Sequence, residues 1–282
     1  MQIRQLATGD ELRLEAFLAS HRDSSMFLRS NARRAGLGYA GERFQAIYAG
    51  AFRDGVMVGV VAHGWNGMLL IQAPELGDEL ARACLGWSQR PVSGLTGPLE
   101  QVRQVTAALR LDTTNAKFRS DDWLYALDLV ELVVPPELAT GATLSRPPLE
   151  AERERLHAWR LAYDIELLGS TDSVETRART AAALDRQVTD GAVWVAVDRG
   201  LPVSIAAFTA VLPDIVQLGG IYTPPELRGW GFARVAIAGS LLAARERGVT
   251  RAVLFTANPN AVRTYEALGF RRIGDYALIL LH

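Results

Sequence analysis

The chain has 282 residues, of which 49% are hydrophobic and 22% charged, and its formal net charge at pH 7 is −1. These values suit a globular protein of about two domains, and the balanced charge provides no basic field for nucleic acid or an anionic membrane surface. Cys84 is the single cysteine and the four histidines lack metal-ligand spacing, so neither an intrachain disulfide nor a metal site is predicted. The N-terminus lacks the apolar core of a signal peptide and no uncharged apolar run is long enough for a membrane span, so we expect a cytoplasmic protein without a membrane partner.

The sequence pattern of the first half predicts helices, then an antiparallel meander, then alternating helices and strands. The residues Gly36–Gly41 read G-x-G-x-x-G, but helical residues rather than a strand precede them, so a loop is favoured over a nucleotide site. Arg53-Asp54-Gly55 and Trp65-Asn66-Gly67 have the composition of hairpin turns. The expected helices are Asp10–Ser20, Met26–Ala35, Asp78–Trp87 and Leu99–Leu109, and the expected strands are Phe44–Phe52, Val56–Gly64, Met68–Ala73, Val92–Thr96 and Trp123–Val134.

The sequence pattern of the second half predicts the same order of helices and strands as that of the first half. Its expected helices are Leu149–Leu168, Val174–Val188, a helix ending at Arg247, and Pro259–Leu268; its strands are Ala192–Val197, Pro202–Val211, Ile215–Thr223, Ala252–Thr256 and Tyr276–Leu281. Two Pro-Pro pairs bracket Glu137–Arg146, which indicates a linker. We therefore expect domains at 1–134 and 149–282 with a linker at 135–148. Each domain is expected to be α+β, of the α/β sandwich type, with a mixed, mostly antiparallel, twisted sheet flanked by helices.

A strand, a glycine-rich loop and a small-residue helix follow one another in Val216–Ser240. Gly219-Gly220 predicts a bulge or kink in the strand, and the prolines that follow end it. The free N–H groups and the dipole at the start of the helix favour an anion. The loop lacks the Gly-Lys pair of a nucleotide hydrolase, and Arg234 takes the third glycine position of the dinucleotide fingerprint.

From Arg228 to Ala233 the loop reads R-x-x-G-x-A, which resembles the acyl-coenzyme A loop of the GNAT (GCN5-related N-acetyltransferase) acyltransferases. Thr256–Phe270 resembles the family segment N-x-x-A-x-x-x-Y-x-x-x-G-F. An ordinary glycine-rich turn is the alternative for the loop. The resemblance covers about residues 149–282 and implies that acyl-CoA binds in a V-shaped opening where Ile215–Thr223 parts from Ala252–Thr256.

The same resemblance implies which residues bind the cofactor. Strand backbone would pair with pantetheine, and the loop amides, with the charge of Arg228, would hold the pyrophosphate. The residues expected to bind acyl-CoA are Ile221, Tyr222, Thr223, Arg228, Gly229, Trp230, Gly231, Phe232, Ala233 and Asn258. For Asn258, capping of the following helix is the alternative role. No metal ligand is expected.

Catalysis would need an acid for the departing thiolate and a base for the attacking amine. Tyr265, with an unperturbed pKa of about 10, is the candidate acid, and a packed core tyrosine is its alternative role. Glu166 is the candidate base, with Asp164 beside it; both could instead be solvated charges on a helix.

The two halves can also be overlaid. Pro74–Arg82 resembles Pro225–Arg234 with the loop arginine missing, and Glu79 replaces Gly231, with Asp78 next to it. Two carboxylates at a helix N-terminus would repel a pyrophosphate. The overlay predicts tandem GNAT-like domains of which the first copy has lost its cofactor site; the alternative is a coincidence between two α/β segments.

The predicted function is N-acyltransfer, most simply the transfer of an acetyl group from acetyl-CoA to a primary amine by direct attack. The alternative is a catalytically silent acyl-CoA-binding or regulatory protein. A small molecule and a peptide both remain possible acceptors, and no nucleic-acid partner is expected. The sequence leaves the acceptor, the acyl length and the oligomeric state undecided.

Overall fold

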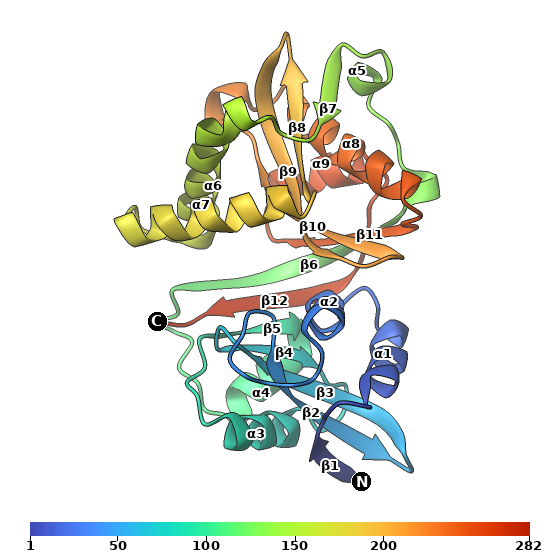
Figure 1. Ribbon diagram of the computed structural model, residues 1–282, viewed down its shortest axis with the longest axis vertical. Coiled ribbons are helices and arrows are strands. Elements are labelled where there is room, and N and C mark those ends of the chain that lie inside the picture. The colour runs from blue at the N-terminus through green and yellow to red at the C-terminus, as the bar shows by residue number, and fades with distance from the viewer. The chain divides into compact units, whose positions relative to one another are not determined.

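A computed structural model describes residues 1–282, which form two compact units. One unit consists of Met1–Leu124 together with Ile273–His282, and the other of Tyr125–Arg272. In each unit helices flank a mixed, mostly antiparallel sheet (Figure 1). The fold class predicted from the sequence is therefore confirmed.

The first unit has a sheet of strand order β1-β2-β3-β4-β5-β12, in which only β4 and β5 pair in parallel. Its elements are β1 (Gln2–Gln5), α1 (Glu11–Ser20), α2 (Met26–Ala35), β2 (Ala46–Arg53), β3 (Val56–Gly64), β4 (Met68–Gln72), α3 (Gly77–Ser88), β5 (Gly94–Pro98), α4 (Leu99–Ala108), β6 (Phe118–Asp128), which extends into the second unit, and most of β12 (Arg271–Leu280). The predicted turn between β2 and β3 is confirmed, since Asp54 and Gly55 both have positive φ, as a type I′ hairpin requires.

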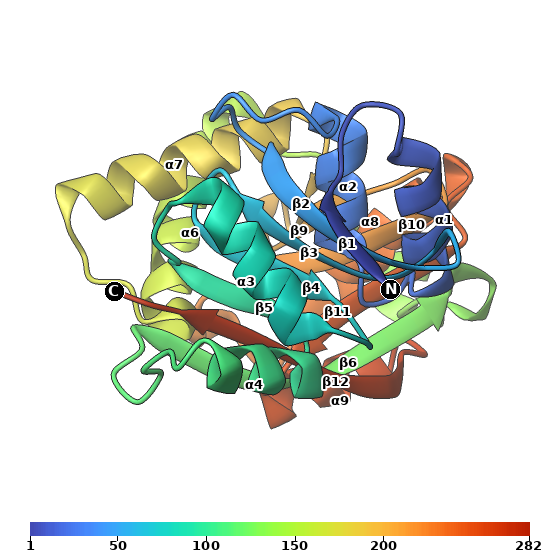
Figure 2. The same ribbon diagram turned by 90° about the horizontal axis from the view of Figure 1, so that it is seen from below.

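Helices cover both faces of this sheet. Leu14 and Leu18 of α1 pack with Tyr48 on one face, and Leu80 of α3 packs with Val102 of α4 on the other. Figures 1 and 2 show the helix pair α1 and α2 on one side and the pair α3 and α4 on the other. Because alternate strand residues face opposite sides, burial on both faces explains the nearly continuous apolar runs of β2 and β3.

The second unit has the strand order β6-β11-β10-β9-β8-β7, in which β10 and β11 pair in parallel. Its further elements are α5 (Pro136–Ala139), β7 (Thr143–Arg146), α6 (Arg153–Leu168), α7 (Val174–Thr189), β8 (Val193–Asp198), β9 (Leu201–Val211), β10 (Ile215–Tyr222), α8 (Phe232–Glu246), β11 (Arg251–Thr256) and α9 (Pro259–Glu266). Leu156 of α6 and Leu184 of α7 pack on Val195 and Ile205 of the sheet. Figure 1 shows α8 on the opposite side of the strands from α6 and α7.

The order of strands and α-helices is repeated. From β1 to β6 it is strand, two helices, three strands, helix, strand, helix, strand, and from β7 to β12 it is the same. In both halves a parallel pair lies at the same place, β4 with β5 and β10 with β11. The repeat that the sequence predicted is present.

Pairing partners explain why the compact units differ from the sequence-based division at 134 and 149. The last strand pairs with β5, from Tyr276 opposite Pro98 to Leu280 opposite Gly94, so it completes the first sheet. The segment 135–148, expected to be a linker, contains α5 and β7, and Thr143–Arg146 pairs with β8. Backbone groups of such a segment gain hydrogen-bond partners by adding to a sheet edge, a preference that proline punctuation does not reveal.

Candidate functional site

The strand β10 contains the predicted bulge. Gly219 lies opposite Ala207 and Tyr222 opposite Ile205, so two residues of β10 face one residue of β9 between these pairs. Gly220, inside the bulge, has a φ of +63°, a backbone conformation that a residue with a Cβ rarely adopts. The bulge therefore turns backbone groups of β10 out of the regular ladder.

The strands β10 and β11 also part as predicted. Their parallel pairing runs from Ile215–Arg251 to Gln217–Val253, although β10 continues to Tyr222 and β11 to Thr256. Ile221 and Thr256, beyond the paired region, are half-buried. Backbone groups of β10 beyond Gln217 are thus no longer committed to β11.

The loop after β10 leads into an uncapped helix start. Gly229 and Gly231 have φ values of +85° and +82°, and Gly231 is the N-cap of α8 without a capping side chain. The first turn of α8 contains no acidic residue. The first N–H groups of a helix have no intrahelical partner and carry the positive end of the dipole, so this end of α8 suits an anion. Trp230 between the glycines is 72% exposed.

Arg234 is a site residue that sequence reasoning did not assign. A Cβ on Gly231 would lie 2.8 Å from Nη2 of Arg234, so the guanidinium folds back over the glycine at the helix start. A cation in the first turn of a helix is unfavourable for the helix dipole. That unfavourable position was the available signal that Arg234 is placed to meet an anion.

Arg228 links the loop to α6. Its Nη2 donates to Oε2 of Glu166 at 2.7 Å and its Nε donates to the carbonyl of Thr223 at 2.9 Å. The guanidinium lies 5.6 Å from the ring centroid of Tyr222. Burial, followed by the charge of Glu166, raises the pKa of the Tyr222 phenol. The structure thus brings together the predicted base, Glu166, and the predicted phosphate ligand, Arg228.

The two carboxylates on α6 differ in their surroundings. Asp164 is 1% exposed and pairs with Arg160 at 2.9 Å and with Arg179 at 3.2 Å, so it is a buried structural anion and not a solvated helix charge. Glu166 is 40% exposed and paired with Arg228, so it is accessible but not free. Of the two, only Glu166 can reach solvent.

Tyr265 lies on α9, and Asn258 is the N-cap residue of this helix. Tyr265 is 7% exposed and packs edge-on against Phe270, with ring centroids 6.0 Å apart. Burial, and after it the neighbouring Tyr163 of α6, raises the pKa of its phenol, so the phenol keeps its proton at neutral pH. Asn258 caps α9, because its side chain accepts from the backbone N–H of Asn260 at 2.9 Å.

The corresponding region of the first unit is closed. A Cβ on Gly97 of β5 would lie 2.5 Å from the carbonyl oxygen of Ile71 in β4, so the two backbones remain in close approach. The N–H of Ala73, just past β4, donates to the side chain of Gln101 at 2.7 Å. Asp78 and Glu79 occupy the first turn of α3. The ladder of β4 and β5 also ends after three pairs, at Leu70–Thr96, but here the backbones stay close beyond it and the helix start is acidic.

Residues 154–270 match the family model described as the acetyltransferase (GNAT) family. By this match residues 154–270 are similar to a GNAT acetyltransferase domain. Members of this family transfer an acetyl group from acetyl-CoA to an amine. A curated relative, the acetyltransferase Atu2258 of Agrobacterium fabrum, is 43% identical over 60 residues, which are 21% of this chain and 42% of that protein. The chain therefore matches less than half of the length of this relative.

Solved GNAT structures share the fold over nearly the whole chain. A GCN5-related N-acetyltransferase from Kribbella flavida has a TM-score of 0.59 at 18% identity, covering 92% of this chain and 94% of its own. A tandem GNAT protein from the clavulanic acid biosynthesis pathway has a TM-score of 0.53 at 14% identity, and the match covers 99% of this chain and 97% of that protein. The GNAT-like fold inferred from two short motifs is thus found in the tertiary structure.

No group of three or more His, Cys, Asp or Glu side chains is arranged to hold a metal ion. None of the helices combines the length and the apolar character needed to cross a membrane.

Proposed function

We propose that the chain is an acetyl-CoA-dependent N-acyltransferase that acetylates a primary amine by direct attack on the thioester. The observation that carries the proposal is the parting of β10 and β11 next to the β10 bulge, followed in the chain by the uncapped start of α8. Pantetheine would pair with backbone of Ile221, Tyr222 and Thr223 in the opening. The amides from Gly229 to Ala233, with Trp230 and Phe232 between them, would hold the pyrophosphate.

Arginines would supply the charge for the pyrophosphate. Arg234 lies against Gly231 at the start of α8, and Arg228 is paired with Glu166. An incoming pyrophosphate would compete with Glu166 for Arg228, because both are anions with matching geometry for a guanidinium. Binding of the cofactor would then release the Glu166 carboxylate. Asn258 would contribute mainly by fixing the start of α9 beside the opening.

The reaction requires a base that takes a proton from the attacking amine and an acid that gives a proton to the departing thiolate. Glu166 is proposed to accept the proton of the attacking ammonium, directly or through water, since it is the exposed carboxylate on the α6 side of the site. A backbone N–H at the bulge is proposed to stabilise the oxyanion. Tyr265 is proposed to protonate the departing thiolate, a role for which its raised pKa keeps it in the neutral form.

The first unit is proposed to be a degenerate GNAT-like copy. The repeated element order supports duplication, and the contact of Gly97 with Ile71 and the acidic start of α3 support loss of the cofactor site. We therefore expect one molecule of acetyl-CoA per chain.

Calorimetry with acetyl-CoA, and thiol release in the presence of a panel of small-molecule and peptide amines, test the function. Binding of one equivalent with amine-dependent thiol release is the expected result. Tight binding without turnover of any amine would instead favour a silent acyl-CoA-binding protein, and no binding would refute both.

A further inference from the structure

A cation on α6 lies against the β10 bulge. A Cβ placed on Gly220 would lie 3.3 Å from Nη1 of Arg160, so this guanidinium fills the space beside the bulge glycine. Arg160 reaches this position from the helix that also carries Glu166, the proposed base. The bulge is where the acetyl group is proposed to react, so Arg160 stands at the side from which an acceptor would approach.

The guanidinium is fixed on three sides. Its Nε donates to Oδ1 of Asp164 at 2.9 Å, and its Nη1 donates to Oε1 of Gln187 on α7 at 3.3 Å. It also lies 5.5 Å from the ring centroid of Tyr163. A guanidinium has five N–H donors, and these two bonds leave others available. The side chain is 18% exposed, which combines a fixed position with access from solvent.

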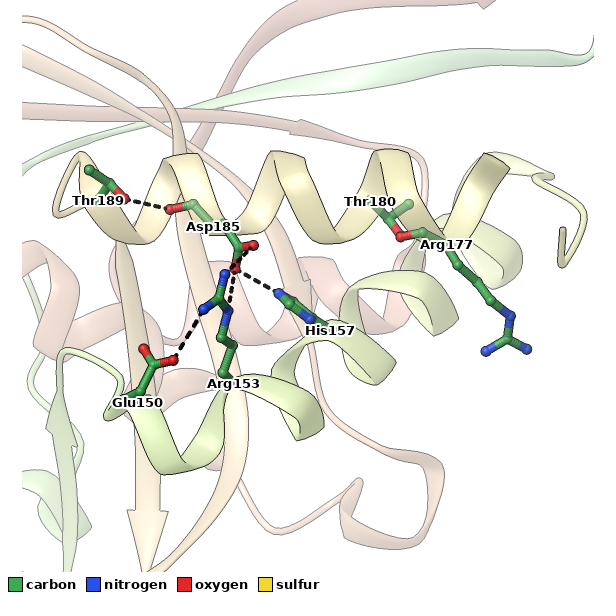
Figure 3. A network of polar contacts seen from close by, with 7 residues as sticks. All are labelled: Glu150, Arg153, His157, Arg177, Thr180, Asp185 and Thr189. Atoms are coloured by element: carbon green, nitrogen blue, oxygen red, sulfur yellow. Dashed lines mark hydrogen bonds and ion pairs between the residues drawn. The ribbon is translucent and has the colours of Figure 1, made fainter. Parts of the chain in front are cut away.

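Side-chain contacts between α6 and α7 hold Arg160 in place. One turn before it, His157 Nε2 lies 2.7 Å from Oδ1 of Asp185, and Arg153 donates to the other oxygen of the same carboxylate at 2.8 Å (Figure 3). Gln187, two residues after Asp185, in turn donates to the carbonyl of Phe208 on β9 at 3.2 Å. The rotamer of Arg160 therefore depends on contacts that cross from α6 through α7 to the sheet.

The charges around Arg160 do not cancel. The buried carboxylate of Asp164 is shared by Arg160 and Arg179, so two guanidiniums meet one carboxylate. The other acidic side chains near these contacts are engaged, Glu166 with Arg228 and Asp185 with Arg153. The set of Arg160, Arg179 and Asp164 therefore keeps a net positive charge, and Arg160 is its member next to the bulge and the more shielded of the two guanidiniums. A partly shielded cation interacts with an anion more strongly than an exposed one.

We propose that Arg160 binds a carboxylate of the acyl acceptor, so that the preferred acceptor is a primary amine that also carries a carboxylate, such as an amino acid. This inference rests on the proposed N-acyltransferase function and specifies its substrate class. Arginine suits the role because its planar fork forms paired hydrogen bonds with a carboxylate. An acceptor without the carboxylate would leave the guanidinium unpaired, and a site built to bind a polar group discriminates against the analogue that lacks it.

The test compares matched acceptors. L-amino acids, β-alanine and γ-aminobutyrate are each paired with their carboxamide, and acetyl-CoA-dependent thiol release gives kcat and KM for both members. For wild type, kcat/KM of at least one acid is expected to exceed that of its amide by about tenfold or more, as hydrogen bonds to a charged group allow. Arg160→Gln should abolish the preference, chiefly by raising KM for the acid.

Arg179→Gln is the matched control, because it removes the other guanidinium from Asp164 and the surplus charge with it, but leaves the Arg160 fork against the bulge; it should lower the preference less than Arg160→Gln does. Melting temperatures verify folding, and if Arg160→Gln does not fold, Arg160→Lys, which keeps the charge on Asp164 but loses the fork, should lower the preference for the acid. Equal rates for acid and amide in every wild-type pair, or an unchanged preference in a folded Arg160 variant, overturn the inference while leaving the acetyltransferase intact. Failure to bind acetyl-CoA overturns the function and the inference together.

Discussion

Replacement of Gly231 by glutamate should weaken the binding of acetyl-CoA about a hundredfold or more. Gly231 has a φ of +82° and caps α8 with no side chain in front of the free amides. A residue with a Cβ pays about 1–2 kcal/mol for this left-handed conformation, which depopulates the loop shape that binds. The new carboxylate would also occupy the anion position itself, as Glu79 is proposed to do in the first unit.

The expected loss can be worked out from these two effects. Two unit charges about 4 Å apart repel by about 1 kcal/mol in water and by about 4 kcal/mol near a partly shielded protein surface. Since the loop is largely exposed, we take the lower part of that range for each pyrophosphate charge. Together with the backbone cost this gives about 3 kcal/mol or more, which corresponds to a Kd raised about a hundredfold.

Calorimetry with acetyl-CoA measures this loss directly, and two alanine variants separate its parts. Gly229→Ala has nearly the same φ and no atom within 4 Å of the new Cβ, so it reports the backbone cost alone. Gly231→Ala adds displacement of Arg234, and only Gly231→Glu adds charge, so its excess should shrink at high salt. A folded Gly231→Glu protein that binds acetyl-CoA within threefold of Gly231→Ala would refute the phosphate assignment of the loop.

Three further predictions concern the acid, pH and the last strand. Tyr265→Phe should lower kcat about 10²–10⁴-fold with nearly unchanged acetyl-CoA affinity; wild-type rates in a folded variant would exclude the phenol as the acid. Burial raises the pKa of Asp122 to about 6, so ionisation of this carboxyl in the folded chain costs stability as the pH rises from about 4 to 6, at most about 3 kcal/mol. Asp122→Asn should therefore raise the melting temperature at pH 8 more than at pH 4, and an equal effect at both would contradict this cause. A fragment of residues 147–282 leaves β12 without its partner β5. In gel filtration it should show a larger aggregated fraction than a fragment of residues 125–272. A smaller aggregated fraction for 147–282 would argue that the unpaired β12 is not what causes aggregation.

Local patterns in the sequence were sufficient for most of the elements. The hairpin at Asp54-Gly55 and the glycine bulge in β10 both depend on backbone conformations that few residues adopt. Such constraints act within a few residues, so they can be read without knowing the fold. The two motifs that indicated GNAT are of this kind, because a phosphate-binding loop is built from consecutive amides.

The pairing of distant strands and the partners of charged side chains were decided only by the tertiary structure. Nothing near Tyr276–Leu280 in the sequence indicates that this strand pairs with Gly94–Pro98, since an apolar alternating run suits any sheet edge. Asp164 and Glu166 are two residues apart on one helix, yet one is buried between arginines and the other paired with the loop. Helical spacing fixes the direction in which a side chain leaves the axis, but burial and partners depend on what the rest of the chain brings there. For the same reason the sequence did not indicate a role for Arg160, because its position beside Gly220 exists only when α6 packs against the bulge of β10.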